Sequence, residues 1–422
     1  MTPARPYPAR HGRLPRHLHE VTPQWLTSVL RNRYPGIEVL GMTVVEVRNG
    51  HTTKLRVALE LNGIGVAAGI PRQVCLKSNW SEGFESGDIC ELESRFYHLM
   101  RDQLQAPVTR AYFADWDGDG GGRGVVMMED LAAADGAFGH STHRLGVDGV
   151  ARGLESLAVL HGALWDSPLL REQAWLPVSM DTPVDTEQLL RMFNYIALNL
   201  AKPDYQAVLP RWILDTPALF AQAFDDLAEF ARTQPGPRCL VHGDSHQGNS
   251  FLRAKGEASN EASGERVWHD WQLVRQGQPW RDVTYFMLGA LTVEERRASA
   301  DALLRHYREA LAATGARDVP DQDAAWAHFR RWPVYGMQSW LGNVDRWGQS
   351  GLPMVERFFA AAEDMDTIAL LTAGKTPRRR VKLGEGARPV TPDLRDPSPP
   401  VRAERETPIV LSLSKVGPPP AR

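Results

Sequence analysis

The sequence has 422 residues, a formal net charge of −3 and 43% apolar residues, with 13 Trp and 13 Phe. This length suits two lobes of ordinary size, and the apolar content is enough for substantial cores, so a globally disordered chain is excluded. Because there is no basic excess, we expect neither nucleic acid nor an anionic membrane surface as a partner. Three scattered cysteines favour a reducing compartment over a disulfide framework.

The first 20 residues carry positive charge, but no apolar stretch follows them. We therefore expect a flexible N-terminus rather than a secretory signal. No run approaches the roughly 20 apolar residues that a membrane-spanning helix needs. A cytoplasmic protein with no membrane partner is the expectation.

The first third of the chain is predicted to consist mainly of strands. Thr22 and Pro23 begin a short helix, as an N-cap followed by proline at the first helical position. In TKLRVALEL apolar and charged residues alternate as in a half-buried strand, and Asn62-Gly63 closes a turn after it. Strands are predicted within residues 37–78 and at 124–131, with a helix at 91–105 between them.

Helical spacing dominates after residue 145, interrupted by two strand-like pieces, RCLVHGD and ERVWHDW. Strands first and helices afterwards indicate an α+β protein, with a β-rich N-terminal lobe and a mainly helical C-terminal lobe. Helices are predicted at 147–166, 184–201, 215–233, 293–314, 320–346 and 352–373.

Two segments, LVHGDSHQGNSFL and VWHDWQ, carry the chemistry, and each begins in an apolar strand. His242-x-Asp244, with Asn249 five positions after the aspartate, reproduces the H-R-D-x-x-x-x-N spacing of a kinase catalytic loop. Asp270 lies 21 residues after Asn249, where the metal-binding aspartate of the second kinase motif is expected.

Phosphoryl transfer depends on positioning and charge neutralisation more than on covalent steps. One carboxylate must orient the acceptor hydroxyl and take its proton, while hard oxygen ligands hold Mg²⁺ on the β- and γ-phosphates. We therefore interpret Asp244 as the catalytic base, and Asn249 and Asp270 as the metal ligands.

HGDxHxxN followed by DWQ resembles the aminoglycoside phosphotransferase and choline-kinase-like superfamily, most closely its ecdysteroid-kinase-like (CHK kinase-like) branch. The resemblance extends over roughly residues 37–370. It implies a two-lobed protein-kinase-like fold and an ATP- and Mg²⁺-dependent phosphotransferase whose acceptor is a small-molecule alcohol.

The resemblance also implies which residues bind the nucleotide. Lys77, at the end of the strand QVCLKS, would contact the α- and β-phosphates, with Glu93 as its helix partner. In VMMEDL, the backbone of Glu129 and Leu131 would face adenine.

The sequence departs from the family pattern in two places. The Gly-rich phosphate loop is reduced to RNGHTTK, in which Gly50 and Thr52 are the expected contacts. An extra polar stretch, AKGEASNEASGER, is interpreted as a long hairpin turn between the two motifs. Near them, Asp282 resembles the acid that braces the catalytic loop, His242 is interpreted as structural, and a role for His246 stays open.

Together these inferences divide the chain into four parts. The tail is rich in Pro and charge and lacks periodicity, which predicts disorder. The expected parts are a flexible N-terminus (1–20), a nucleotide-binding lobe (21–130), a helical catalytic and acceptor-binding lobe (131–374) and a disordered tail (375–422).

Other functions were weighed against a small-molecule kinase. His242-x-Asp244-x-His246 could begin a zinc hydrolase ligand set, but the remaining ligands would have to be recruited singly. GDSHQG fails the serine nucleophile pattern G-x-S-x-G. The stretch from Asp270 to Asp282 is too short for the activation loop of a protein kinase. A catalytically inactive, nucleotide-binding homologue that acts as a scaffold or sensor is the alternative left open.

The acceptor is expected between Asp244 and the aromatic-rich helices near the C-terminal end. Trp332, Tyr335 and Trp340 could share one helix face there. An apolar or terpenoid-like alcohol is favoured over a choline-like or antibiotic acceptor. An aminoglycoside needs dense acidic clusters, and the nearest candidate is the acidic stretch at 363–366.

Overall fold

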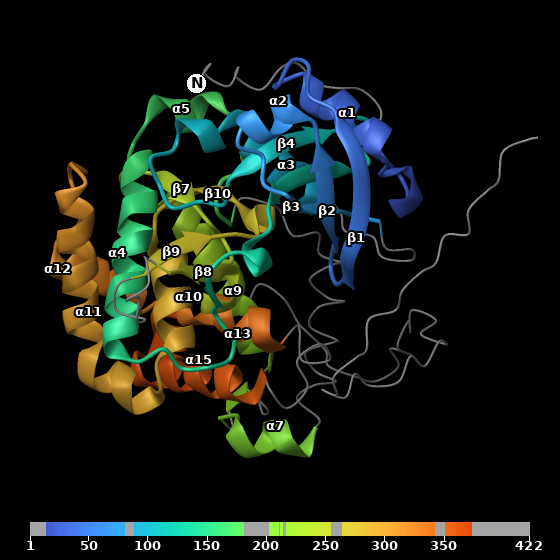
Figure 1. Ribbon diagram of the computed structural model, residues 1–422. Coiled ribbons are helices and arrows are strands. Elements are labelled where there is room, and N and C mark those ends of the chain that lie inside the picture. The colour runs from blue at the N-terminus through green and yellow to red at the C-terminus, as the bar shows by residue number, and fades with distance from the viewer. Residues whose placement is uncertain are drawn as a thin grey trace, which may run out of the picture. The chain divides into compact units, whose positions relative to one another are not determined.

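The N-terminal lobe is built on an antiparallel sheet that follows the alternation in the sequence. Its strands are β1 (Val39–Asn49), β2 (Thr53–Leu61), β3 (Gln73–Ser78), β4 (Ala111–Trp116) and β5 (Gly124–Glu129). They lie in the order β1-β2-β3-β5-β4 (Figure 1). Alternation along β2 buries Leu55, Val57 and Leu59 in the core of this lobe. The opposite face of the sheet therefore carries the polar side chains of β2, among them Lys54 and Arg56.

The computed structural model describes most of the chain, and everything below refers to that part. The described residues are 14–80, 88–180, 202–210, 212–213, 217–254, 264–341 and 351–373. The predicted helix at 184–201 and the predicted disordered tail at 375–422 lie outside them. Of the N-terminal stretch expected to be flexible, residues 14–20 are described: Leu14 is buried, and Trp80 Nε1 donates to Pro15 O at 3.0 Å.

Three helices accompany the sheet: α1 (Pro23–Arg31), α2 (Gly63–Ala67) and α3 (Ile89–Leu99). Thr22 caps α1 as predicted, because its Oγ1 accepts from Trp25 N–H at 3.1 Å. The turn predicted at Asn62-Gly63 is instead the start of α2. Asn62 Oδ1 accepts from Gly65 N–H at 3.0 Å, so the residue is a helix cap.

The C-terminal lobe is mainly helical, and its central helix is one that the sequence analysis did not predict. The helices are α4 (Val147–Ala163), α5 (Pro168–Glu172), α7 (Pro203–Val208), α9 (Pro217–Thr233), α10 (Trp280–Ala290), α11 (Val293–Ala313), α12 (Gln322–Phe329), α13 (Pro333–Leu341), α15 (Leu352–Asp364) and α16 (Thr367–Thr372). Every residue of α10 is buried. The helix predicted at 320–346 is wrong as one piece, because α12 ends before Trp332 and α13 begins at Pro333.

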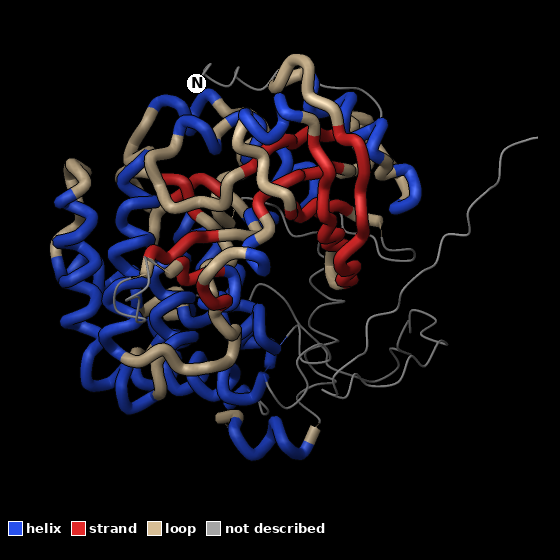
Figure 2. The backbone as a smooth tube through the Cα atoms, in the orientation of Figure 1, coloured by secondary structure: helices blue, strands red, loops and turns tan. Residues whose placement is uncertain are grey.

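Two small sheets lie among these helices and present the motif loops. The strands are β6 (Gly136–Phe138), β7 (Cys239–Val241), β8 (Ser250–Arg253), β9 (Glu265–Trp268) and β10 (Arg275–Gly277). One sheet has the order β6-β8-β9 and the other pairs β7 with β10. Figure 2 shows these short red strands apart from the larger sheet. The strands expected in RCLVHGD and ERVWHDW are thus β7 and β9, and the α+β class is confirmed.

No helix among the described residues is long and apolar enough to cross a membrane.

Candidate functional site

The loop after β7 is fixed from beneath by Asp282, which projects from the first turn of α10. Asp282 Oδ2 accepts from His242 N–H at 2.6 Å, and Oδ1 accepts from Gly243 N–H at 2.9 Å. Burial alone would raise the pKa of Asp282, but the hydrogen bond to His161 at 3.2 Å and these backbone donors hold it below its usual value. The carboxylate therefore stays ionised and braces the loop, the role expected from the sequence.

Gly243 is required by the geometry of this loop. Its φ is +86°, and a Cβ atom there would lie 1.9 Å from Leu273 O. Only glycine fits such a close approach in the left-handed region. The HGD turn is therefore packed directly against the segment that follows Asp270.

Asp244 is presented to solvent at the end of this turn. Asn249 Nδ2 donates to Asp244 Oδ2 at 3.0 Å and to Asp244 O at 2.8 Å. His246 Nε2 lies 3.7 Å from the same Oδ2, and the Asp244 side chain is 32% exposed. The structure therefore brings Asp244 and Asn249 together, and the Asn249 amide orientation leaves Oδ1 as the atom available to a cation.

Lys77 joins the two lobes through a buried ionic cluster. Its Nζ lies 2.8 Å from Glu93 Oε2 and 2.7 Å from Asp270 Oδ1. The Lys77 side chain is 3% exposed and that of Glu93 2%. Because Lys77 comes from β3, Glu93 from α3 and Asp270 from the loop after β9, three distant parts of the chain meet at one ammonium group.

The charge states of this cluster follow from its contacts. Burial alone would lower the pKa of Lys77, but the charges of Asp270 and Glu93 raise it above its usual value. Burial alone would also raise the pKa of Asp270, but Lys77 and Lys54 hold it well below the usual range. Lys77 is therefore an ammonium ion and Asp270 a carboxylate at neutral pH.

The segment around Asp270 is tied to both α3 and the loop after β7. Trp271 N–H donates to Glu93 Oε1 at 3.0 Å, and the Trp271 ring stacks on Phe96 with centroids 4.2 Å apart. His242 Nε2 lies 2.9 Å from His269 O, and its Nδ1 accepts from Asp244 N–H at 3.2 Å. His242 thus makes structural hydrogen bonds, as its sequence interpretation expected.

Two contacts to this cluster were not found by sequence reasoning. Lys54 lies opposite Lys77 in the β2–β3 register, and its Nζ is 3.4 Å from Asp270 Oδ2. The amide of Gln272 forms hydrogen bonds with both residues: its oxygen accepts from Lys77 Nζ at 2.9 Å, and its nitrogen donates to Asp270 Oδ1 at 3.2 Å. The alternation along β2 indicated that Lys54 lies on the polar face of the sheet. Its pairing with Lys77 could not be predicted without the β2–β3 register.

The same Gln272 oxygen accepts from Thr52 Oγ1 at 3.0 Å, so Thr52 is connected to the cluster from the turn between β1 and β2. Thr52 is 4% exposed. Gly50 behaves differently: it is exposed at the turn, where its N–H donates to Thr52 O at 3.1 Å. The structure therefore brings Thr52, but not Gly50, toward Lys77 and Asp270.

A cavity of about 290 Å³ lies beside the cluster and is lined from both lobes. Of the residues predicted from the sequence, Lys77, Glu93, Glu129, Leu131 and Asp270 line it, whereas Gly50, Thr52, Asp244 and Asn249 are not among its lining residues. The further lining residues are Glu46, Arg48, Lys54, Arg56, Cys75, Met128, Asp130, Ala132, Phe138, Gly139, Gly248 and His269. The lining combines apolar side chains, such as Cys75 and Phe138, with the cations Lys54 and Lys77.

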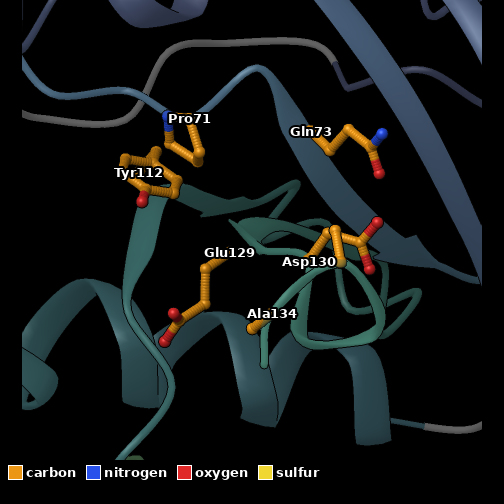
Figure 3. Close-up of a pocket in the computed structure, with 7 residues that line it drawn as sticks. Pro71, Gln73, Tyr112, Glu129, Asp130 and Ala134 are labelled. Carbon is orange, nitrogen blue, oxygen red and sulfur yellow. The ribbon is translucent and has the colours of Figure 1, made fainter. Parts of the chain in front are cut away.

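The segment that links the lobes, from Glu129 to Leu131, has its carboxylates already paired. Glu129 Oε1 accepts from Arg110 N–H and its Oε2 from Arg253 Nη2, each at 2.8 Å. Asp130 accepts from Arg56 Nε at 2.9 Å. Both acids also line a second cavity of about 360 Å³, where their side chains leave the ribbon on different sides (Figure 3). Because these side chains are already paired, we expect a ligand in the first cavity to contact the backbone groups of this segment.

Aromatic rings lie around His246, whose Nε2 is 3.7 Å from Asp244 Oδ2. The His246 ring lies 6.2 Å between centroids from Tyr285 and from Trp340. Tyr335 Oη donates to Gly243 O at 2.9 Å, so Tyr335 supports the loop. Trp332 is buried at 3% exposure.

The acidic stretch at 363–366 is not a free cluster. Asp364 is paired with Arg296 and, at 2.7 Å, with Arg297 Nε. Arg330 Nη2 lies 3.8 Å from Asp366. Asp364 and Asp366 therefore already have arginine partners, which compete with the ammonium groups of a polycationic acceptor.

No group of three or more His, Cys, Asp or Glu side chains among the described residues has the arrangement of a metal site. This does not support the zinc hydrolase reading. The two oxygen donors expected to hold Mg²⁺, Asn249 Oδ1 and Asp270 Oδ2, have the chemistry that this ion prefers. Lys54, 40% exposed and 3.4 Å away, is the contact that a cation on Asp270 Oδ2 would displace.

Comparison with known proteins gives one family match. The sequence profile of the Ecdysteroid kinase-like family matches residues 90–317, more than half of the chain. This confirms the resemblance inferred from the motifs, and with it the two-lobed kinase-like fold. A search of curated proteins gives no match.

Solved structures with similar folds are distant in sequence. A GDP complex of an aminoglycoside 2'-phosphotransferase-IIIa variant is 13% identical with a TM-score of 0.44, covering 82% of this chain and 98% of the other. A putative fructosamine-3-kinase from Thermobifida fusca is 16% identical with a TM-score of 0.45, covering 80% and 98%. Ethanolamine kinase from Plasmodium vivax is 9% identical with a TM-score of 0.43, covering 77% and 81%. No functional conclusion rests on these similarities.

Proposed function

Because this chain belongs to the ecdysteroid kinase-like family, we propose that it is a phosphotransferase that moves the γ-phosphoryl group of ATP, with Mg²⁺, to a hydroxyl of a small molecule. The observation that carries the proposal is the buried contact of Lys77 with both Glu93 and Asp270. A buried ammonium held this way is preorganised to meet phosphate oxygens without reorganisation. It stands beside a cavity large enough for a nucleotide base.

The nucleotide is proposed to enter the 290 Å³ cavity. Its base would lie near the backbone of Glu129 and Leu131, which is the prediction made from the sequence, and near the apolar lining residues Cys75 and Phe138. Lys77 meets the α- and β-phosphates. Lys54 supplies part of the phosphate contact that a Gly-rich loop would otherwise make. Its side chain is partly exposed, and its Nζ already lies 3.4 Å from Asp270 Oδ2.

Asn249 and Asp270 would hold Mg²⁺, which would supply positive charge to neutralise the phosphates of the nucleotide. Asp244 then accepts the proton of the acceptor hydroxyl as the bond from the acceptor oxygen to the γ-phosphorus forms and ADP leaves. The hydrogen bond from Asn249 Nδ2 orients the Asp244 carboxylate, and its partial exposure makes it reachable by an acceptor.

The acceptor is proposed to be an alcohol with an apolar body. Tyr285 and Trp340 lie around His246 next to Asp244; both are buried, so they would form an apolar backing behind such an acceptor. The pairing of Asp364 with two arginines argues against an aminoglycoside.

The first test is a calorimetric titration with a non-hydrolysable ATP analogue, with and without Mg²⁺. Saturable binding that tightens with Mg²⁺ supports the proposal, and Arg305→Gln, on the exposed surface of α11, is the control expected to bind normally. Mg²⁺-indifferent binding favours the inactive scaffold or sensor. No binding by protein shown to be folded would contradict the nucleotide site altogether.

A second experiment addresses the acceptor and is informative once nucleotide binding is established. ADP release is measured against sterols, amino alcohols, macrolides and aminoglycosides. Release stimulated by a sterol-like alcohol supports an apolar acceptor, whereas stimulation by aminoglycosides alone would overturn that part of the proposal.

A further inference from the structure

A series of buried hydrogen bonds connects three helices to the loop after β7. Tyr307 Oη, from α11, lies 2.8 Å from His161 Nδ1, and His161 Nε2, from α4, lies 3.2 Å from Asp282 Oδ2 in α10. All three side chains are 0% exposed. Helix α4 packs against both α10 and α11 (Figure 1), so the series runs through the interior of the C-terminal lobe.

The hydrogens of this series all point toward Asp282. Because the pKa of Asp282 is held below its usual value, the carboxylate is ionised and can only accept, so His161 Nε2 carries the proton between them. Burial raises the pKa of Tyr307 well above its usual value, so its hydroxyl keeps its hydrogen. Among the described residues, His161 Nδ1 is the only hydrogen-bond partner of Tyr307 Oη, so the hydroxyl donates to it. Tyr307 thus orients the ring of His161, and His161 orients the carboxylate of Asp282.

Asp282 holds the backbone on both sides of the proposed catalytic base. Its carboxylate accepts from the N–H groups of His242 and Gly243, at 2.6 and 2.9 Å, and its backbone carbonyl accepts from Ser245 Oγ at 3.0 Å. In the described part of the chain, His161 is the only side chain that donates to this carboxylate. A buried carboxylate that loses a donor keeps a charge that is no longer compensated. The orientation of Asp282, and with it the position of the HGD turn, therefore depends on His161.

We propose that His161 and Tyr307 are positioning residues for phosphoryl transfer. By fixing Asp282, they set the place of Asp244 relative to the acceptor hydroxyl. This inference rests on the proposed phosphotransferase function, in which Asp244 takes the proton of that hydroxyl. A misplacement of about 1 Å can slow a reaction about a hundredfold. Neither His161 nor Tyr307 lines the cavity proposed for the nucleotide, so we expect the two residues to affect turnover and not nucleotide affinity.

Two substitutions of His161 separate positioning from packing. The side-chain nitrogen of glutamine can donate from about the place of the imidazole Nε2, whereas leucine fills the site without a donor. His161→Leu is expected to lower kcat for ADP release about tenfold or more, because a hydrogen bond to a charged group is lost, and to leave the KM for ATP nearly unchanged. His161→Gln should recover most of the kcat. Equal losses in both variants would overturn the proposal, since packing and not the donor would then matter.

Tyr307→Phe removes one hydroxyl and keeps the ring. We expect kcat to fall about threefold with the KM for ATP unchanged, because Tyr307 acts on Asp282 only through His161. The matched control is Thr367→Val in α16, which also removes one buried hydrogen bond, from Thr367 Oγ1 to Arg330 O at 2.7 Å. Thr367→Val should lose stability and keep its kcat. Equal reductions of kcat in the two variants would reflect general destabilisation and would contradict a positioning role.

Hydrogen exchange tests the same positioning without any acceptor. The amides of His242 and Gly243 should exchange about tenfold faster in His161→Leu than in the unaltered protein, because Asp282 is their acceptor, and at the unaltered rate in Thr367→Val. Unchanged exchange in a folded His161→Leu variant would refute the proposal. If the unaltered protein binds no ATP analogue, the phosphotransferase function fails, and the exchange rates still decide whether His161 fixes this loop.

Discussion

Asp244 and Asp270, the two acids of the proposed reaction centre, are held in different ways, and this separates their roles at the scale of single residues. Asp270 has a lysine at each oxygen, Lys77 at 2.7 Å and Lys54 at 3.4 Å, and is tied into the cluster between the lobes. Asp244 receives the Asn249 amide, lies 3.7 Å from His246 Nε2 and is partly exposed. Asp270 is therefore placed to neutralise phosphate charge through a cation, and Asp244 to act on the acceptor.

Asp244→Asn is expected to abolish phosphoryl transfer while binding of the Mg²⁺-bound ATP analogue stays nearly intact, because the amide cannot take the acceptor proton. Asp270→Asn is expected to weaken the Mg²⁺ dependence of binding itself. Calorimetry and ADP release measured on both variants distinguish the two effects. Equal, mild losses in both variants would contradict this division of roles.

Lys54→Met is expected to reduce affinity for the triphosphate analogue by about tenfold, the value of one charge-assisted contact. Affinity for AMP should change little, because AMP lacks the phosphates that Lys54 would meet. Arg305→Gln serves as the control, as its pair with Asp301 is exposed. If Lys54→Met weakened AMP and the triphosphate alike, Lys54 would be supporting the fold rather than the phosphates.

At the scale of elements, the HGD turn depends on a glycine that α10 and the segment after Asp270 enclose. Gly243→Ala places a methyl group 1.9 Å from Leu273 O in addition to the strain of φ +86°. We expect a loss of roughly 2–4 kcal/mol in the free energy of unfolding, measured by urea denaturation.

Gly315 provides a matched comparison, because its φ is +90° but nothing lies within 4 Å of its added Cβ. Gly315→Ala should therefore cost only the backbone strain, about 1–2 kcal/mol. Similar losses in both alanine variants would show that packing against Leu273 contributes nothing.

Sequence patterns predicted these elements unevenly. Strand β2 and the cap Thr22 were predicted because alternation and capping are local signals. The central helix α10 was missed; it is buried on every side, so its polar residues do not mark a solvent-exposed face. Strand β4 was missed for the same reason, as all six of its residues are buried.

At the scale of the whole molecule, acid should destabilise the fold through buried histidines. Burial lowers the pKa of His269 to about 3 and also lowers that of His242. Unfolded histidine titrates near 6.5, so between about pH 3 and 6.5 the unfolded chain binds protons that the folded chain does not. The stability contributed by neutral His269 is therefore complete above about pH 6.5 and decreases as pH falls, by about 1.4 kcal/mol per unit.

The measurement is urea denaturation of the unaltered protein and of His269→Asn between pH 5 and 7. The unaltered protein should lose more stability over this interval than the variant does. If the stability of the variant depends on pH as that of the unaltered protein does, then His269 titrates alike in the folded and unfolded states and the prediction is wrong.

The candidate site was predicted better from the sequence than its surroundings were. His242, Asp244, Asn249 and Asp270 could be proposed because their spacing is a local signal. Lys54 could not, since a cross-strand partner exists only once the chain has folded.

The contacts of Lys77 and Glu93 have a consequence for how the protein acquires its activity. Lys77 reaches Asp270 across 193 residues of sequence, and Glu93 reaches Trp271 across 178. Such non-local contacts form late in folding, because long loops must close before they are made. A nucleotide that needs both lobes would therefore bind only completely folded molecules. An ATP analogue should then report complete folding. It should also stabilise destabilised variants during expression, because it binds the folded state.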